Sequence, residues 1–453
     1  MLNPTNCSLR FDEPVAQSTT TTLPKRTTSV QSRLNVLIVT QFYPPDYAAT
    51  GQLIAELAGH LGALGLRMNI FTGQPGYAFD RDSAPKREAQ HRVQVQRSRT
   101  SRLWPMRIRG RAINSLLFCF RAAFHLLTQS KRYELLIVTS EPPYLPILGY
   151  LMQALLGIPY VCVLYDLYPD VAVALNVLSA RHPLVRLWDR LNRLIWQRAQ
   201  SIVVLSSSMR SRVVAKAPRV ADKIQIIPSW SDPRTIVPLA KQDNWFAQEQ
   251  NLVHRFTVQY SGNLGRCHDM DTILTAAELL KQSPIQFVFI GKGAQLAACQ
   301  QRAQQRDLNN CRFLPYQDKS VLPYSLTACD LALVSISPGL EGLVAPSKLY
   351  GILAAGRPVA AICEAHSYLR AVLQQANCGQ AFSNGDAIGL ANYIQYLADN
   401  PTQVKELGQA GRRYLNANYT LEHVAQQYWQ VCTATRPQRE NMSSVNHPKT
   451  RRK

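Results

Sequence analysis

The chain has 453 residues, of which 46% are hydrophobic, so it is long and apolar enough for more than one domain with a buried core. Its ten cysteines form no C-x-x-C pair and no tight cluster with histidine, which argues against a zinc site or a disulfide framework and for a reducing compartment. The formal net charge of +21 is compatible with a nucleic-acid partner, an anionic membrane surface or a phosphorylated substrate.

The two ends of the chain differ in composition from the rest. Residues 1–33 lack an apolar core and include a serine and four threonines in a row at 18–22, so we expect a disordered leader without the apolar region of a signal peptide. Residues 436–453 are polar and basic and are predicted to form a disordered tail after a helix over 419–435. Between these ends the chain is continuously patterned.

Strands and helices are predicted to alternate in the first half. A buried strand at 34–40 runs through a loop with Gly51 into a helix that has leucines on one face. Further strands are predicted at 67–72, 93–97, 135–139, 160–164 and 201–205. Such alternation indicates a parallel sheet covered by helices on both faces. We expect this N-terminal domain to span residues 34–235.

Residues 142–165 carry no charge, and this length would suffice for a transmembrane helix. However, Gly157 and Pro159 interrupt the segment after a helix-length piece, and β-branched residues follow. A buried helix followed by a buried strand is therefore the favoured prediction.

A polar region over 229–255, with Pro233 and Pro238, is predicted to be an interdomain linker with some local helix. The alternation then restarts, with strands predicted at 256–260, 286–290, 312–314, 330–336 and 358–362 and helices at 269–281, 294–306, 319–328 and 349–355. The second domain is expected to span 236–418. The predicted fold class is therefore α/β, with two doubly wound Rossmann-like domains facing across a cleft that holds the ligands.

The segment 338–359 brings a carboxylate, a lysine and a helix start together. Glu341 lies in a glycine-containing loop, Ser347 is a plausible N-cap, and Lys348 is in the first turn. The unpaired amides and the dipole of a helix start favour phosphate, and a carboxylate suits the hydroxyls of a ribose or hexose. Taken alone, the window is equally compatible with an ordinary connection that carries a surface lysine and glutamate.

Glycine turns also follow several predicted strands, where small residues let the backbone approach a ligand. Arg266, Lys292 and Lys348 would supply positive charge to a diphosphate, whereas His268 is expected to be a polar contact. The residues predicted to bind this ligand are Gly51, Gly262, Asn263, Arg266, His268, Gly291, Lys292, Gly293, Glu341, Ser347 and Lys348.

With these motifs in place, the chain resembles the family 4 retaining glycosyltransferases of the GT-B fold, and more narrowly the bacterial enzymes that build exopolysaccharide, O-antigen or colanic-acid repeats. The resemblance covers roughly residues 33–431 and is carried by the segments 42–51, 261–266, 289–293 and 341–358. It implies transfer of a hexose from a nucleotide-diphosphate sugar, commonly a UDP-sugar, with retention and without a cofactor or an essential metal. The second domain would hold the nucleotide and the first the acceptor.

The chain departs from the usual pattern of this family at several positions. Members usually carry two glutamates separated by seven residues; Glu341 stands two places too early for the first, and Gly351 occupies the place of the second. Glu341 is therefore predicted to contact either the ribose or the donor sugar. Asn263 and His268 replace the family's arginine and lysine on the diphosphate, so Arg266 and Lys348 are expected to neutralise that charge.

On the acceptor side, Tyr165 replaces a histidine that is common in the wider family. Asp166 or Asp170, which follow at the end of a buried strand, is then the candidate for contacting the acceptor hydroxyl. Capping of the next helix is the structural alternative for both. The catalytic candidates are Asp166, Asp170, Arg266, Glu341 and Lys348.

Much of the positive charge lies between residues 81 and 132, which contain thirteen lysines or arginines against two acidic residues. The segment Arg107–Leu127 is predicted to form a basic amphipathic helix that binds an anionic membrane surface and brings the enzyme to a polyprenyl-diphosphate-linked saccharide acceptor. We thus expect a cytoplasmic enzyme peripheral to the inner face of the cell membrane. The alternative is a helix buried against its own sheet with a solvated basic flank.

Two other functions would fit part of the sequence. A nucleic-acid-binding protein would explain the basic charge, but no binding motif or interleaving of aromatic residues with the charges supports it, so no nucleic-acid partner is expected. A nucleotide-sugar epimerase of the same architecture is closer. It would need neither an acceptor nor a membrane-facing helix.

Overall fold

The computed structural model describes residues 34–46, 49–75, 84–90, 92–99 and 108–434. The predicted leader at 1–33 and the predicted tail at 436–453 lie outside the described residues, as does Arg107. The described chain is mixed α/β with two Rossmann-like parallel sheets, as predicted from the sequence. The boundary at residues 235 and 236 stays a prediction.

The first sheet has eight strands in the order β3-β4-β2-β1-β5-β6-β7-β8, parallel except for β3. Its strands are β1 (Asn35–Val39), β2 (Arg67–Thr72), β3 (Arg87–Gln90), β4 (Val93–Arg97), β5 (Leu135–Thr139), β6 (Tyr160–Leu164), β7 (Ser201–Val204) and β8 (Ile224–Ile226). The sequence did not predict β3 or β8. Both are short strands at the sheet edges, where few apolar residues are needed.

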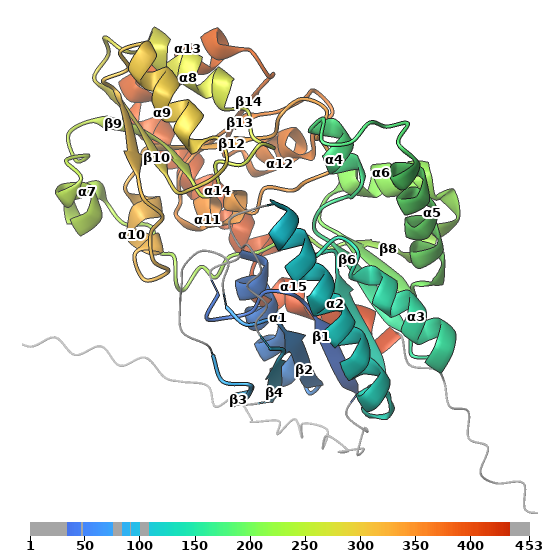
Figure 1. The fold of residues 1–453 in the computed structure, drawn as a ribbon. Coiled ribbons are helices and arrows are strands. Elements are labelled where there is room, and N and C mark those ends of the chain that lie inside the picture. Colours follow the sequence, from blue (N-terminus) through green and yellow to red (C-terminus); the bar gives the residue numbers. More distant parts are fainter. Residues whose placement is uncertain (1–33, 47–48, 76–83, 91, 100–107, 435–453) are drawn as a thin grey trace, which may run out of the picture. The chain divides into compact units, whose positions relative to one another are not determined.

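Helices cover both faces of this sheet (Figure 1). The helices in this half of the chain are α1 (Ala49–Ala63), α2 (Ile108–Gln129), α3 (Pro146–Leu156), α4 (Asp170–Ala174), α5 (Pro183–Arg198) and α6 (Ser207–Lys216). Two 3₁₀ turns, η1 (Ser130–Arg132) and η2 (Pro218–Lys223), accompany them. Successive residues of β5 point to opposite faces, so Leu136 packs in one cluster with α2, α3 and α5 while Ile137 packs in another with α1.

The uncharged segment 142–165 forms α3 and then β6, as predicted. The two elements pack closely, since a Cβ on Gly149 of α3 would stand 2.6 Å from the ring of Tyr160 at the start of β6. Among the described residues, no helix has both the length and the apolar character needed to cross a membrane.

The second sheet has six parallel strands in the order β11-β10-β9-β12-β13-β14. They are β9 (Phe256–Ser261), β10 (Ile285–Ile290), β11 (Cys311–Leu314), β12 (Leu331–Ser335), β13 (Val359–Ile362) and β14 (Gly379–Phe382). The helices are α7 (Trp245–Glu249), α8 (Met270–Leu279), α9 (Leu296–Gln305), α10 (Leu322–Thr327), α11 (Lys348–Ala354), α12 (Tyr368–Ala376), α13 (Ala387–Asp399), α14 (Pro401–Asn418) and α15 (Leu421–Ala434).

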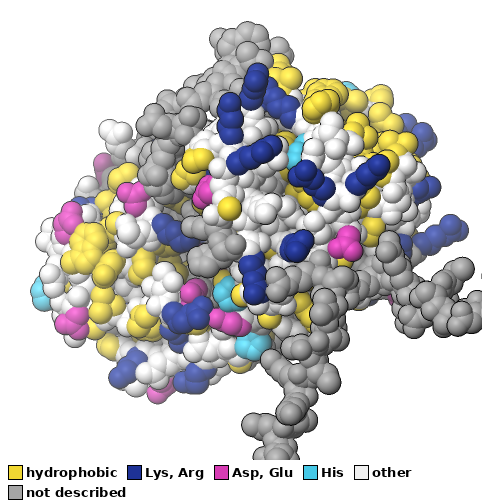
Figure 2. Space-filling model, turned by 90° about the horizontal axis from the view of Figure 1, so that it is seen from below, with side chains coloured by type: hydrophobic (Ala, Val, Ile, Leu, Met, Phe, Trp, Pro, Cys, Tyr) yellow, Lys and Arg dark blue, Asp and Glu magenta, His cyan; other side chains and the backbone are white. Residues whose placement is uncertain are grey.

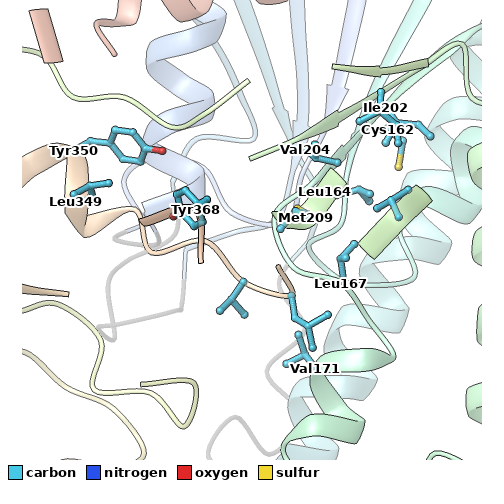
Figure 3. Close-up of a cluster of buried hydrophobic side chains, with 14 of the residues drawn as sticks. Cys162, Leu164, Leu167, Val171, Ile202, Val204, Met209, Leu349, Tyr350 and Tyr368 are labelled. Atoms are coloured by element: carbon cyan, nitrogen blue, oxygen red, sulfur yellow. The ribbon is translucent and has the colours of Figure 1, made fainter. Parts of the chain in front are cut away.

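One hydrophobic cluster joins side chains from both sheets (Figure 3). Leu164 and Val204 come from the ends of β6 and β7, whereas Leu349 and Tyr350 belong to α11. The backbone supports the same contact, because the amide of Leu167 donates to the carbonyl of Leu343 over 2.9 Å. The loop after β6 therefore lies against the loop that carries Glu341.

The predicted linker is held by buried polar contacts. Its short 3₁₀ turn η3 (Lys241–Asp243) and α7 confirm the local helix expected there. The ammonium of Lys241 is buried and lies 2.7 Å from the carboxylate of Asp330. Because Asp330 directly precedes β12, this ion pair connects η3 to the second sheet. The predicted helix at 419–435 is also confirmed as α15, which packs on α1 beside the first sheet.

Candidate functional site

The loops that follow β9 and β10 pack against each other at the carboxyl edge of the second sheet. The amide of Gly262 donates to the carbonyl of Ile290, and the amide of Leu264 donates to that of Lys292, each over 2.8 Å. Gly291 has φ of +139°, and a Cβ there would stand 2.0 Å from the Gly262 carbonyl oxygen. These glycines thus let two loops approach each other, which the sequence analysis attributed only to the approach of a ligand.

Lys348 and Tyr260 form the centre of the candidate donor site. Lys348 begins α11, and its ammonium donates a 2.5 Å hydrogen bond to the hydroxyl of Tyr260, the buried residue near the end of β9. The Tyr260 hydroxyl in turn donates to the carbonyl of Asn263. Sequence reasoning missed Tyr260, although its position at a strand end next to a glycine turn was a usable signal.

The Lys348 ammonium has no acidic partner in the part of the chain that the structure describes. The side chain is half-buried, and this burial lowers the pKa of Lys348 to about 7. An anion bound beside it would favour the charged form and raise the pKa again. The structure therefore corrects the picture of an exposed surface lysine.

His268 packs edge-on against the ring of Tyr260. Its Nδ1 lies 2.8 Å from the Ser335 carbonyl oxygen, which can only accept, so Nδ1 carries the proton and Nε2 is left as an acceptor. Burial first, and Lys348 second, lower the pKa of His268 to about 3. The imidazole is hence neutral near pH 7 and is a polar contact, not a source of positive charge for a phosphate.

Glu341 does not join this group. Its side chain is 1% exposed, and its Oε1 accepts a 3.3 Å hydrogen bond from the amide of Tyr368 at the start of α12. Its backbone carbonyl accepts from Nε of Arg212, a residue of α6. Oε2 has no hydrogen-bond partner among the described residues. The carboxylate thus faces the start of α12, and no hydrogen bond or ion pair among the described residues connects it to Lys348.

The remaining donor candidates are exposed or structural. Ser347 occupies the N-cap position of α11, but its exposed side chain makes no capping hydrogen bond. Asn263 and Lys292 are exposed. A Cβ on Gly51 would lie 2.9 Å from the backbone at Phe42, so this glycine is needed where α1 meets the loop after β1.

Arg266 is exposed and its guanidinium donates to the carbonyl of Leu175, at the end of α4, over 2.8 Å. It lines a cavity of about 360 Å³ together with residues of three loops. The cavity lining comprises Ala174, Leu175, Asn176, Arg266, Gln295, Ser337, Pro338 and Leu340. A ligand in this cavity would therefore contact both the segment after β6 and the loop after β9.

Two carboxyl groups stand at neighbouring strand ends of the first sheet. Asp166 follows β6 and Glu141 follows β5, and the hydroxyl of Ser140 accepts hydrogen bonds from the amides of Tyr165 and Asp166. Glu141 was missed in the sequence analysis, although it occupies the same position after its strand as Asp166 does after the next one. Parallel strands bring such positions to one edge.

The environment of both carboxyl groups favours their protonated forms. Burial raises the pKa of Asp166 to about 6. Burial also raises the pKa of Glu141 to about 7, with a hydrogen bond from Thr50 opposing the shift and the charges of Asp166 and Asp46 adding to it. Oε2 of Glu141 is shielded from solvent and unpartnered within the described chain. This carboxyl can therefore exchange a proton near neutral pH.

Asp170 forms an ion pair, a contact that the sequence did not predict. It lies in the first turn of α4, whose N-cap position is occupied by Pro169, so the capping alternative is wrong for Asp170. Its carboxylate lies 2.5 Å from the ammonium of Lys216, which also contacts Asp189 at 2.6 Å. This ion triad ties α4, α5 and α6 together. Asp166, by contrast, forms no ion pair among the described residues, and burial raises its pKa.

No group of three or more His, Cys, Asp or Glu side chains is placed to hold a metal ion within the described ranges.

Comparison with protein families assigns both halves of the chain. Residues 49–230 match the model of the "Glycosyl transferase 4-like domain", and residues 241–414 match that of the "Glycosyl transferases group 1". The chain belongs to the family 4 type of glycosyltransferases with the GT-B fold. The resemblance noted in the sequence is thereby confirmed.

Two curated relatives bear names from bacterial polysaccharide synthesis. The chain is 26% identical over 331 residues to a probable glycosyltransferase WbjE of Pseudomonas aeruginosa, covering 72% of this chain and 80% of the relative. It is 30% identical over 171 residues to the putative colanic acid biosynthesis glycosyl transferase WcaI of Escherichia coli K12, covering 37% of this chain and 42% of the relative.

Solved structures show the same fold. Sucrose-phosphate synthase from Thermosynechococcus elongatus has a TM-score of 0.69 at 19% identity, over 89% of this glycosyltransferase and 99% of that chain. Anabaena Alr3699/HepE, solved in complex with UDP and glucose, has a TM-score of 0.68 at 14% identity, over 89% of this chain and 100% of that chain.

Proposed function

We propose that this glycosyltransferase moves a hexose from a UDP-sugar to a lipid-linked saccharide in the synthesis of a bacterial surface polysaccharide, with retention of configuration and without a metal. The names of WbjE and WcaI support the pathway, and the UDP and glucose bound to HepE support the donor class. The observation in this chain that carries the proposal is the half-buried ammonium of Lys348, which lacks an acidic partner in the described residues.

Lys348 is proposed to bind the diphosphate of the donor. Negative charge develops on the leaving diphosphate as the glycosidic bond breaks, and a fixed cation in a partly water-excluded site stabilises that charge. Arg266, at the rim of the cavity beside the loop after β9, is the second proposed cation. Gly262, Gly291 and Gly293 keep the two loops in the arrangement that places Lys348.

On the acceptor side, Asp166 is proposed to accept a hydrogen bond from the attacking hydroxyl. Its pKa of about 6 leaves it largely ionised at neutral pH, so both of its oxygens can accept that bond. Glu141, whose pKa is about 7, is proposed to hold a proton beside it, which limits the repulsion between the two carboxyl groups. Asp170 is proposed to support α4 through Lys216.

We further propose that the enzyme is peripheral to the inner face of the cell membrane, through the predicted segment Arg107–Leu127. The described part of this segment forms α2, whose Phe120 and Phe124 are 64% and 70% exposed. The alternative of a helix buried against its own sheet with a solvated basic flank accounts for Phe118 and Leu126, which are in the core, but not for the two exposed aromatic rings.

A nucleotide-sugar epimerase would use the same donor site, so ligand binding alone does not separate the two functions. The decisive test incubates the protein with radiolabelled UDP-glucose, with and without a membrane-lipid extract that contains polyprenyl-linked saccharides, in the presence of EDTA. Transfer of label to the lipid fraction supports the proposal. Conversion of the UDP-sugar to its epimer without an acceptor would establish the epimerase instead.

A further inference from the structure

Three helices on one face of the first sheet carry a row of exposed apolar side chains. α2, α3 and α5 all pack their inner sides into the same hydrophobic cluster, and α3 contacts both of the others. Their outward sides therefore belong to one surface, here called the α2–α3–α5 face. Its exposed large apolar residues are Ile113, Leu116, Phe120, Phe124, Leu127, Leu151, Leu155, Leu156, Leu184, Leu187 and Leu194.

The helix α5 shows the pattern most clearly. Its spacing places Leu184, Leu187 and Leu194 on one half of the outward side, because residues three or four apart lie on the same side of a helix. Val185 and Ile195 are buried against the sheet. A helix of a soluble domain normally has polar residues opposite its buried side, so the exposed leucines indicate a surface that meets another apolar phase.

The other half of the outward side of α5 is basic. Arg186, Arg190 and Arg193 are exposed, and none of them forms an ion pair with an acidic side chain of the described residues. The single acidic residue of α5, Asp189, is already paired with Lys216 of α6. The sequences of α2 and α3 contain no acidic residue at all. The face thus combines exposed leucines with uncompensated positive charge.

The space-filling view shows the same combination on one side of the molecule. Lysine and arginine side chains are spread over that part of the surface with few acidic side chains between them, and hydrophobic side chains gather along its edge (Figure 2). A partner for such a surface must offer an apolar layer beneath a layer of negative charge.

From these observations we infer that the α2–α3–α5 face docks on an anionic lipid bilayer, with α5 contributing as a second membrane-binding helix beside α2. Phosphate groups of the lipids would meet Arg186, Arg190 and Arg193, and the leucines of α5 would lie at the level where headgroups meet acyl chains. A second copy of the chain is disfavoured as the occupant, because two such faces would oppose like charges. The inference extends the proposed peripheral location, in which α2 alone was assigned.

The test is co-sedimentation of the full chain with vesicles of phosphatidylcholine, with or without phosphatidylglycerol. The arginine variant carries Arg186→Gln, Arg190→Gln and Arg193→Gln. Each basic residue near an anionic surface strengthens binding several-fold, so we expect about a 100-fold loss of binding to the anionic vesicles. Higher salt should weaken the wild type more than this variant.

The leucine variant carries Leu184→Ser, Leu187→Ser and Leu194→Ser. These leucines are exposed, so the thermal midpoint of the variant should stay near that of the wild type while binding to the anionic vesicles falls at least tenfold.

Matched controls come from exposed residues of the second half. Lys281→Gln, Lys405→Gln and Arg413→Gln remove the same number of charges, and Leu279→Ser with Ile388→Ser removes exposed apolar side chains. Both controls should sediment like the wild type. An equal loss in the first control would mean that net charge alone matters, which contradicts a defined face.

Two results would overturn the inference. One is wild-type binding by both α5 variants while Phe120→Ser with Phe124→Ser abolishes it, since α2 would then act alone. The other is absence of wild-type binding to anionic vesicles. Sedimentation needs no turnover, so it is independent of the proposed transfer reaction. If the protein binds vesicles but shows no thermal shift with UDP, the membrane-binding face is supported and the proposed function is contradicted.

Discussion

The ammonium of Lys348 donates to the hydroxyl of Tyr260 and lies 4.1 Å from the centre of the same ring. A phenol and its π-face stabilise a cation only weakly compared with a carboxylate. The lysine is consequently held in place while its charge is left for a ligand.

The affinity for UDP-glucose should fall as the pH rises above about 7. The pKa of free Lys348 is lowered to about 7, whereas a bound diphosphate favours its charged form, so binding above pH 7 must take up a proton. We expect a loss of about tenfold per pH unit there and a plateau at lower pH. Isothermal titration calorimetry between about pH 6 and pH 9 measures this pH dependence of the affinity for UDP-glucose.

Lys348→Arg is the matched control, because arginine stays charged throughout this range. Its affinity should be lower at neutral pH, since the larger side chain fits the Tyr260 contact less well, but it should change little with pH. A wild-type affinity that is flat across the range would disprove the assigned role of Lys348.

Gly291→Ala should destabilise the protein by more than about 2 kcal/mol and abolish the thermal shift caused by UDP. The residue has φ of +139°, and the added Cβ would clash with the carbonyl oxygen of Gly262. Gly59→Ala is the control, because Gly59 lies exposed in α1 with open space around its Cβ position. That change should be neutral or slightly stabilising. Equal midpoints in differential scanning fluorimetry would contradict the interlocked-loop account.

Many strand positions were predictable from the sequence because the strands carry either an apolar run, as in β5 and β6, or alternating apolar residues, as in β4. Residues 67–72, 93–97, 135–139 and 160–164 were predicted with the bounds that the structure has. The edge strands β3, β8 and β14 were not predicted, since REAQ, IQI and GQAF are short and hold few apolar residues. The local signal weakens wherever one side of a strand faces solvent.

The candidate site was predictable only in part, because spacing along the chain does not tell which way a side chain points. Lys348 and Gly262 were identified from a helix start and a glycine turn, and the structure brings them together. Glu341 occupied an equally suggestive loop, yet its carboxylate faces the amide of Tyr368. Glu141 and Tyr260 were missed because their importance depends on their burial, and segments far away in the sequence bury them.

Glu141→Gln should stabilise the protein at pH 8 and have little effect near pH 5. The pKa of Glu141 is raised from 4.5 to about 7 in the folded protein, so the unfolded chain ionises first and folding is penalised increasingly between these two pH values and fully above about pH 7. As the pH falls from about 7 toward 4.5 the penalty shrinks, and it is small near pH 5. We expect about 2 kcal/mol at pH 8 by urea denaturation.

Glu249→Gln, at an exposed position of α7, controls for the general loss of a negative charge and should leave the unfolding free energy unchanged at both pH values. Destabilisation by Glu141→Gln at pH 8 would mean that the carboxylate is ionised and paired in the folded state.

Asp166→Asn and Asp170→Asn, the substitutions of the two aspartates after β6, should have different effects on transfer and on the thermal midpoint. Asp166→Asn should lower transfer to the acceptor by at least about 100-fold while the thermal shift with UDP persists, because the proposed contact is to the attacking hydroxyl and not to the nucleotide. Asp170→Asn should lower the thermal midpoint slightly, since Lys216 keeps Asp189 as a partner, and leave transfer within a few-fold of the wild type. The reverse order of effects on transfer would assign the acceptor contact to Asp170 and would require its ion pair with Lys216 to open during the reaction.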